Sequence, residues 1–315
     1  MFDRTDTQAT IHLSPVRSHR PLPTGSLPGT DAPVVPWSVQ SIKAPAAWRK
    51  STGKRIKIAI IDTGVDFNHP DLADAIGGGI NLIHRHMLPL DDNGHGTHIS
   101  GTIAASAKQS GIMGVAPRAT IYAVKAFDHN GTCYVSDIVE GIEWCIKYRM
   151  DIINMSFGMK VRSAPLEAAI KQAYRAGIVI VASSGNEGKR GSVDYPARLP
   201  QTIAVGATNR AGKIAIFTNR GPQIDIYAPG ERVVSTWLNG KYNELSGTSM
   251  ATSHVTGTIA LLLSIHPHLT PWQVKRILQQ QASPLLHTGS RSGFLGQVNA
   301  YKTVSAMANR KKRNA

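Results

Sequence analysis

The 315-residue sequence predicts an α/β fold in which a mostly parallel sheet is covered by helices on both faces. Short apolar runs alternate with amphipathic helical segments, an order that is typical of parallel sheets. The runs are apolar throughout, as expected of strands that are buried on both faces. A hydrophobic content of 42% without a strong shift in composition indicates one large core and one main domain.

The predicted elements follow one another from residue 54 to residue 264. The first strand, 54–62, is an apolar run that ends in an acid and is followed by Thr63-Gly64. Ligand sites of such sheets lie beyond the carboxyl ends of the strands, so the candidate functional residues are expected there. Further strands are predicted at 120–127, 151–157, 178–183 and 202–207, and helices at 95–106, 136–148, 166–176 and 251–264.

The two ends of the chain depart from this pattern. Residues 1–32 are rich in proline and lack apolar periodicity, so we expect an extended or disordered leader or short prosegment whose prolines disfavour strand addition. Residues 33–303 form the main domain, and 304–315 form a basic tail. The formal charge of +15 raises nucleic acid as a partner, but no zinc-finger or aromatic-glycine RNA-binding pattern accompanies it, and nucleic acid is therefore not expected.

Composition also bears on location and on other classes of function. The sequence has no run of about 20 apolar residues and no secretory signal after Met1, which predicts no membrane association and a cytoplasmic location. Cys133 and Cys145 are too few for a disulfide framework, and reduced thiols are expected. No glycine-rich nucleotide loop follows the first strand, which argues against a nucleotide-dependent enzyme.

Three polar residues stand where the active edge of the predicted sheet would gather them. Asp62 ends the first strand, His95 opens the next helix and Ser249 opens the late helix. A serine hydroxyl is a poor nucleophile until a base such as imidazole takes its proton, and a carboxylate on the other ring nitrogen stabilises the imidazolium. Each residue alone has a structural explanation, as a turn residue, a backbone-binding histidine or a helix N-cap. Together they predict an acyl-transfer site.

The motifs that carry these residues resemble those of the subtilisin-like serine proteases. They are IDTGVD at 61–66, HGTH at 95–98, SGN at 184–186 and GTSMA at 247–251. The resemblance extends from about residue 33 to 300, and the short leader resembles that of the intracellular members. It implies a three-layer α/β/α fold with about seven strands. It also implies that Asp62 orients His95, that His95 acts as base and then acid, that Ser249 attacks and that Asn186 donates to the oxyanion, with no catalytic cofactor.

The same resemblance implies a substrate groove. Asp194 aligns with the base of the first specificity pocket, where a carboxylate favours Lys or Arg before the cut, unless the loop turns it to solvent. Cys133 replaces a common glycine and either narrows the groove or is a small half-buried residue. Substrate would lie as an added strand between Gly131, Thr132 and Cys133 on one side and Ser156, Phe157 and Gly158 on the other.

A calcium site of the family is expected to be lost. Asp71 matches one of its carboxylates, but Lys108 and Pro33 stand where oxygen ligands are usual. An ammonium group cannot coordinate a hard cation, so we expect an empty site in which Lys108 pairs with Asp71. A weaker cation site near Ala197 and Asp225 remains an alternative.

The sequence therefore favours a serine endopeptidase that acts on protein or peptide substrates. The alternative is a catalytically silent subtilisin-like binding or regulatory protein, which the departures in the groove and the calcium site support. A nucleic-acid-binding protein rests on charge alone. The oligomeric state and the physiological substrates are not predicted.

Overall fold

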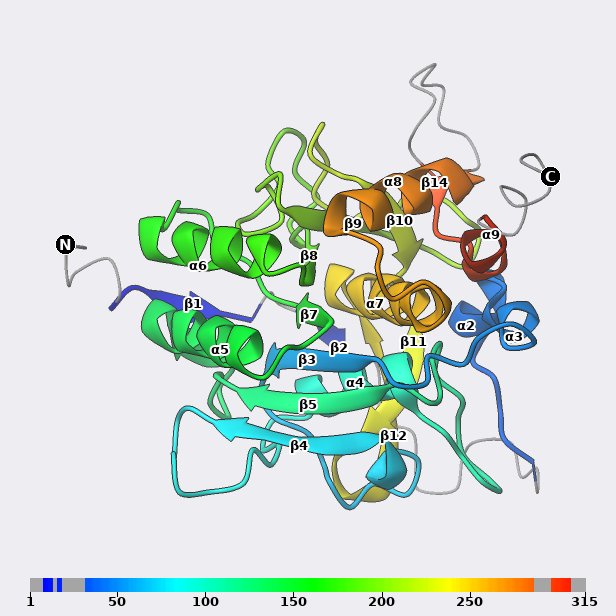
Figure 1. The fold of residues 1–315 in the computed structure, drawn as a ribbon, viewed down its shortest axis with the longest axis horizontal. Coiled ribbons are helices and arrows are strands. Elements are labelled where there is room, and N and C mark those ends of the chain that lie inside the picture. The colour runs from blue at the N-terminus through cyan, green and yellow to red at the C-terminus, as the bar shows by residue number, and fades with distance from the viewer. Residues whose placement is uncertain (1–7, 14–15, 19–31, 286–295, 307–315) are drawn as a thin grey trace.

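The central sheet runs through the whole molecule. The structure, a computed structural model, describes residues 8–13, 16–18, 32–285 and 296–306. In these residues the sheet has nine strands in the order β13-β14-β10-β9-β8-β7-β3-β5-β4 (Figure 1). Every neighbouring pair except β13–β14 is parallel. The predicted three-layer α/β/α architecture is confirmed, with two short strands added at one edge of a seven-stranded parallel body.

Every strand predicted from the sequence is present, and several others join them. The sheet contains β3 (Lys57–Asp62), β4 (Ile76–Asn81), β5 (Thr120–Lys125), β7 (Ile152–Met155), β8 (Val179–Ser183), β9 (Thr202–Thr208), β10 (Ile226–Pro229), β13 (Ser283–Pro284) and β14 (Gly296–Gln297). Two small antiparallel sheets flank it. They consist of β11 (Val233–Trp237) with β12 (Lys241–Ser246) and β2 (Arg17–Ser18), and of β1 (Thr10–His12) with β6 (Thr132–Tyr134).

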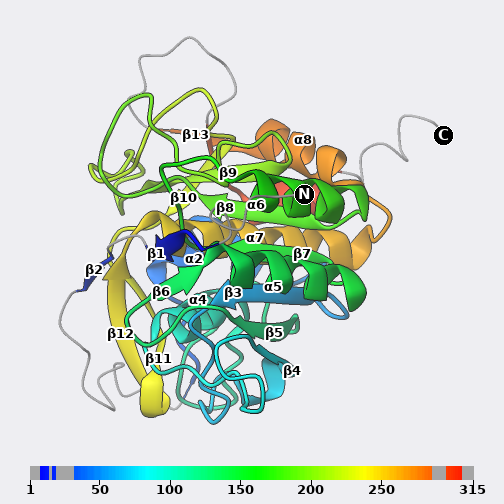
Figure 2. The same ribbon diagram turned by 90° about the vertical axis from the view of Figure 1, so that its left-hand side faces the viewer.

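The helices form the two outer layers. Helices α5 and α6 pack together on one face of the sheet, and α4 and α7 pack together on the other (Figures 1 and 2). No described helix is both long and apolar enough to cross a bilayer. The helices are α2 (Trp37–Ser41), α3 (Ala44–Ala47), α4 (His95–Ala104), α5 (Val135–Lys147), α6 (Ala164–Arg175), α7 (Thr248–Ile265), α8 (Pro271–Gln281) and α9 (Ala300–Ser305), with 3-10 turns at Ala73–Ala75 and Leu238–Gly240.

Two apolar cores, one on each face of the sheet, explain the uninterrupted apolar runs. Successive side chains of a strand point to opposite faces. In β3, Ile58 and Ile60 belong to the core that α4 and α7 cover, whereas Ala59 and Ile61 belong to the core under α5 and α6. Helix α7 is buried from residue 248 to residue 263, so the helix that carries Ser249 is a central element of the fold.

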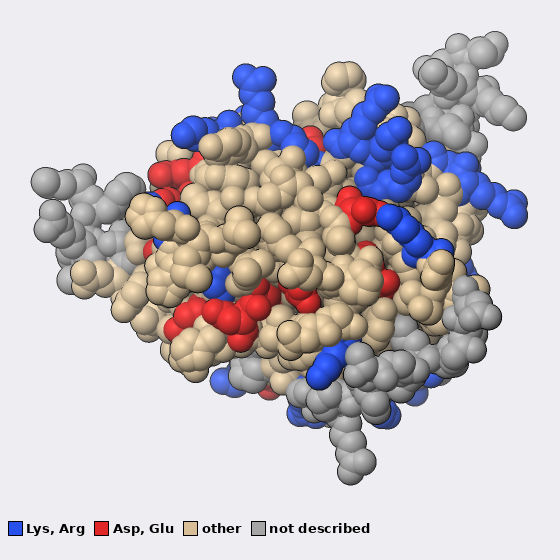
Figure 3. Space-filling model, turned by 90° about the horizontal axis from the view of Figure 1, so that it is seen from below, with Lys and Arg blue, Asp and Glu red and all other residues tan. Residues whose placement is uncertain are grey.

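The surface charge is unevenly distributed. On the face seen from below, Lys and Arg side chains gather toward the upper right, and Asp and Glu side chains gather to the left of the centre (Figure 3). The basic side chains drawn there belong to described residues, so the positive charge of the chain is not confined to its tail. The part of the predicted basic tail that follows residue 306 lies outside the described residues.

Candidate active site

A buried carboxylate and a buried imidazole meet at the carboxyl end of β3. Asp62 is the last residue of this strand, His95 is the first residue of α4, and both side chains are almost fully buried. The Nδ1 atom of His95 lies 2.7 and 2.9 Å from the two carboxylate oxygens of Asp62. An ionised carboxylate makes Nδ1 the protonated nitrogen, so the lone pair is carried by Nε2.

Two opposing effects set the pKa of His95. Burial disfavours the imidazolium and lowers the pKa, whereas the charge and the hydrogen bond of Asp62 raise it. The result is a pKa of His95 above its ordinary value. Its Nε2 atom is buried and has no hydrogen-bond partner among the described residues, so it is available to accept a proton.

The turn before α4 is held by Asp91, which the sequence analysis did not single out. Its Oδ1 accepts hydrogen bonds from two backbone N–H groups of the turn and from the hydroxyl of Thr63. Its Oδ2 accepts two more from Thr97. Since Thr63 directly follows Asp62, this carboxylate joins the end of β3 to the first turn of α4. The sequence around Asp91 is typical of an ordinary turn, and it therefore did not indicate that Asp91 links β3 to α4.

Ser249 lies in the first turn of α7, where the backbone N–H groups face out of the helix. Its side chain is buried, and its Oγ donates to the carbonyl oxygen of Ser156, 2.9 Å away. Ser156 follows β7, the sheet neighbour of β3, so Ser249 lies at the same edge of the sheet as Asp62. His95 and Asp62 are thus hydrogen-bonded to each other. Ser249 lies at the same edge of the sheet, and its hydroxyl points toward Ser156. Rotation about χ1 is the movement that redirects this hydroxyl.

Asn186 is fixed against the turn that carries Ser249. Its Oδ1 accepts hydrogen bonds from the N–H and the hydroxyl of Thr248, at 2.8 and 2.9 Å. With Oδ1 engaged in this way, the donor end of the amide faces Gly247, where an added β-carbon would lie 3.3 Å from Nδ2. An amide donor and the first turn of α7 therefore stand next to each other.

The two segments predicted as groove walls frame this edge. Gly131, Thr132 and Cys133 lie at and before the start of β6, and Ser156, Phe157 and Gly158 follow β7. The side chains of Cys133 and Phe157 are buried in the core under α5 and α6. Burial raises the pKa of the Cys133 thiol well above its ordinary value, so this cysteine is a protonated, buried thiol in the structure.

Part of the leader pairs with one of these two segments, and the expectation that its prolines disfavour strand addition is wrong. Strand β1 lies beside β6 (Figure 2) and pairs antiparallel with it. Ile11 stands opposite Cys133, and the N–H of Leu13 donates to the carbonyl of Gly131 at 2.8 Å. Strand β2 then pairs with the end of β12. The strand residues contain no proline, and the apolar side chain of Ile11 is buried. The rest of the predicted leader, at 1–7, 14–15 and 19–31, lies outside the described residues.

Asp194 is buried beside the same groove and does not face solvent. Its side chain is 2% exposed, and Oδ1 lies 2.6 Å from the Nζ of Lys160. The same ammonium lies 2.6 Å from Glu187 Oε2. Burial is the largest influence and raises the pKa of Asp194, an effect that the hydrogen bond from Lys160 opposes. Lys160 and Glu187 were not found from the sequence, because both lie in loops where charged residues are common.

The predicted pairing of Lys108 with Asp71 is wrong. Lys108 pairs with Asp74, and both side chains are largely exposed. Asp71 is buried and accepts hydrogen bonds from the N–H of Ile112 and the hydroxyl of Tyr242, each at 2.9 Å. Lys108 lies in a loop before Ile112, so hydrogen bonds hold the Asp71 carboxylate while the ammonium group reaches an acid at the surface.

The alternative cation site near Asp225 contains a lysine. The Nζ of Lys275 lies 2.8 Å from Asp225 Oδ2, and it also donates to the carbonyl oxygens of Thr202 and, more distantly, Pro200. One carboxylate and backbone carbonyls are the kind of oxygen donors that a cation would use. In the described ranges, no group of three or more His, Cys, Asp and Glu side chains is arranged to bind a metal ion.

Comparisons with known proteins relate this chain to one family. The profile of the Subtilase family, peptidase family S8, matches residues 53–308. Subtilisin E of Bacillus subtilis is 45% identical over 256 residues, which are 80% of this chain and 67% of that protein. Subtilisin of Bacillus pumilus is 45% identical over 80% of this chain and 92% of its own length. Minor extracellular protease Epr of Bacillus subtilis is 41% identical over 86% of this chain and 42% of that protein.

Proposed function

Because the chain belongs to the subtilase family of serine endopeptidases, we propose that it cleaves peptide bonds with a triad of Asp62, His95 and Ser249. The observation that supports this assignment best is the buried pair of Asp62 and His95, whose Nε2 has no hydrogen-bond partner among the described residues. Ser249 begins a helix at the same edge of the sheet. Protein and peptide chains are the substrates that this family implies.

The proposed proton route uses the two nitrogens of His95 separately. The hydroxyl of Ser249 turns from Ser156 toward Nε2, which takes its proton as Oγ attacks the substrate carbonyl. Asp62 holds the proton on Nδ1 and stabilises the imidazolium that forms. The imidazolium then returns a proton to the leaving amine, and water hydrolyses the acyl group on Ser249 by the same route in reverse.

The oxygen that becomes negative during attack needs hydrogen-bond donors. We assign this role to Nδ2 of Asn186 and to the backbone N–H of Ser249, at the positive end of the α7 dipole. The bonds from Thr248 to Oδ1 fix the amide so that Nδ2 faces Gly247 in the nucleophile turn. Removal of such an amide donor costs about 3 kcal/mol of transition-state stabilisation, a value known for subtilisin itself.

Access to the site is governed by the leader. Residues 10–13 occupy the β6 edge that an extended substrate would use. Val16 lies against the turn that carries Ser249, because a β-carbon added to Gly247 would be 3.1 Å from Val16 Cγ1. Substrate therefore has to displace the leader. A preference for Lys or Arg before the cut remains part of this proposal, supported by the buried carboxylate of Asp194 beside Gly158.

We further propose that no structural calcium is required at Asp71. The hydroxyl of Tyr242 and the backbone N–H of Ile112 already donate to Oδ2 of this carboxylate, and the nearby ion pair of Lys108 with Asp74 supplies an ammonium that cannot coordinate a cation. A cytoplasmic location also remains a prediction. Fractionation of the source cells, followed by detection of the protein with an antibody, tests it.

Labelling with a fluorophosphonate probe tests the function. We expect stoichiometric labelling of the intact chain that is lost in Ser249→Ala and retained in Ser253→Ala, which removes a buried serine one turn later in the same helix. Fragments from a denatured protein mixture should appear under the same conditions. Absence of both labelling and fragments, in the wild-type chain and in a variant with a weakened leader, would establish the catalytically silent alternative.

A further inference from the structure

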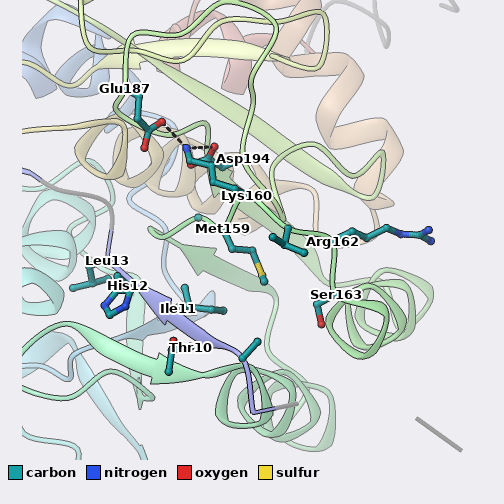
Figure 4. A pocket seen from close by; sticks show the side chains of 13 residues that line it. Thr10, Ile11, His12, Leu13, Met159, Lys160, Arg162, Ser163, Glu187 and Asp194 are labelled. Carbon is teal, nitrogen blue, oxygen red and sulfur yellow. Dashed lines mark hydrogen bonds and ion pairs between the residues drawn. The ribbon is translucent and has the colours of Figure 1, made fainter. Parts of the chain in front are cut away.

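A lysine joins two carboxylates beside the groove. The Nζ of Lys160 lies 2.6 Å from Asp194 Oδ1 and 2.6 Å from Glu187 Oε2, and Figure 4 shows the ammonium between the two acids. The amide Nδ2 of Asn219 also donates to both acids. Two negative charges and one positive charge therefore share one small region.

This cluster lies beside the nucleophile. A β-carbon on Gly158 would be 2.9 Å from Asp194 Oδ2, and one on Gly185 would be 2.4 Å from it, so the carboxylate fills the space between these glycines. Gly158 belongs to the segment whose Ser156 contacts Ser249, and Gly185 directly precedes Asn186. The acid thus lies between the two segments that approach the hydroxyl of Ser249 and its proposed oxyanion donor.

A cavity of about 450 Å³ opens at this place. It is bounded by the leader strand β1 on one side and by residues 158–163 on another, and Glu187 and Asp194 stand at the end opposite the leader (Figure 4). This volume is within the range of small-molecule sites and accommodates a long side chain. A basic side chain that enters it would find both carboxylates already in contact with Lys160.

The exposures of Asp194 and Lys160 show which of these two side chains can move. Asp194 is 2% exposed and is anchored by its backbone, whereas the side chain of Lys160 is 50% exposed and reaches the cluster from the surface. A long, half-exposed lysine changes rotamer at little cost, but two neighbouring carboxylates in a partly desolvated pocket need a counter-charge. Burial lowers the pKa of Lys160, and its bonds to both acids outweigh that effect and raise it.

We propose that Lys160 is a specificity-determining residue: its ammonium occupies the position that the cationic end of a substrate Lys or Arg would take. This inference rests on the proposed function, in which the residue before the cut enters this pocket. With Lys160 in place, the cluster has one net negative charge and favours a basic side chain only weakly, because the substrate must displace Lys160. Without Lys160, both carboxylates are available to the substrate.

The test compares two peptide substrates that differ only in the residue before the cut, Arg or Phe. In Lys160→Met we expect the Arg/Phe ratio of kcat/KM to rise at least tenfold, mainly through a lower KM for the Arg peptide, and to fall again as the ionic strength is raised. Lys160→Arg should keep the wild-type ratio. The gain should disappear when Asp194→Asn is added to Lys160→Met. The leader competes equally with both peptides, so its effect cancels in the ratio.

Lys171→Met is the matched control, because Lys171 is 43% exposed and pairs with Glu167 away from the cavity. Its ratio should equal that of the wild type. An unchanged or lower ratio in Lys160→Met, in protein that labels fully with fluorophosphonate, would overturn the inference and leave the proposed function intact. Loss of labelling and of cleavage of both peptides in every protein, a variant with a weakened leader included, would instead refute the proposed function.

Discussion

The contact of Ile11 with the groove gives a direct test of how the leader controls access. Its side chain is 1% exposed and belongs to the same buried cluster as Phe157 and Ile138. Replacement of a buried isoleucine by alanine costs about 2–5 kcal/mol, and we take about 2 kcal/mol because the leader can shift at the edge of the core. Since about 1.4 kcal/mol is a factor of ten, Ile11→Ala should open the groove about 30-fold more often.

Two assays report this opening. The kcat/KM of a short peptide substrate is reduced by the fraction of molecules in which the groove is open, so it should rise about 30-fold in Ile11→Ala. The reaction of Cys133 with a thiol reagent should accelerate by a similar factor, because β1 covers this residue and Cys133 is 3% exposed. Cys145 lies on the buried face of α5 and should stay unreactive until the protein unfolds, which separates opening of the leader from loss of the fold.

The control is the neighbouring residue of the same strand. His12 is exposed, and its Nδ1 lies 3.0 Å from the hydroxyl of Thr132, so His12→Ala should change both rates less than threefold. If neither the peptide rate nor the thiol rate differs between the wild type and Ile11→Ala, the reasoning is refuted. Such a result would mean that the leader does not dock on β6 in solution, so that loss of the Ile11 side chain has no docked state to weaken.

Four further predictions concern the triad, the oxyanion donor and the cation sites. Asp62 holds the pKa of His95 above 6.5, so the kcat/KM of the wild type should rise with pH through a value above 6.5. Asp62→Asn should lower kcat about 10⁴-fold. It should also move the rise in kcat/KM to lower pH, which a pH–rate profile measures. Asn186→Ala should lower kcat about 10²–10³-fold with little change in KM, which steady-state kinetics measure; a purely structural role would instead lower the melting temperature. Chelation of divalent cations should leave the wild-type melting temperature unchanged, and a melting temperature that falls on chelation and recovers with calcium would contradict the proposal that no calcium is required at Asp71. Tyr242→Phe should lower the unfolding free energy by about 1–3 kcal/mol, because it removes a hydrogen bond to the Asp71 carboxylate. Lys275→Met should cost about 2 kcal/mol in denaturant unfolding, discounted for the partial exposure of the pair, and Asp225→Asn added to it should recover part of this loss.

The sequence predicted five strands of the parallel body because they are continuous apolar runs, but it missed β4 and β10. Strand β4 contains three consecutive glycines, which are unfavourable in a strand, and nothing local indicated that they pair. The structure gives the reason: a β-carbon on Gly79 would lie 2.0 Å from the carbonyl oxygen of Ala123 in β5. Close approach of two strands selects glycine there, and that approach is a property of the tertiary structure.

The candidate site divides in the same way. Asp62, His95 and Ser249 were found because each stands at the end of an element that local patterns identify. Ile11 and Lys160 were missed because their roles depend on partners more than 25 residues away, in β6 for Ile11 and at Glu187 and Asp194 for Lys160. The proline content predicted an extended or disordered leader as a whole. Strand β1 needs only three residues without proline and one apolar side chain, Ile11, that packs into the core.

Several lysines of this chain serve as internal counter-charges for particular carboxylates. Lys160 serves Asp194 and Glu187, Lys275 serves Asp225, and Lys125, itself 3% exposed, serves Asp92. Each ammonium supplies a counter-charge that a carboxylate would otherwise draw from solvent or from a bound cation, and each can do so because a long apolar stem carries the charge to the acid. A chain that uses lysines in this way needs fewer bound cations to stabilise its loops, so part of its lysine content follows from internal pairing. The unfolding free energy of Lys275→Met tests this argument.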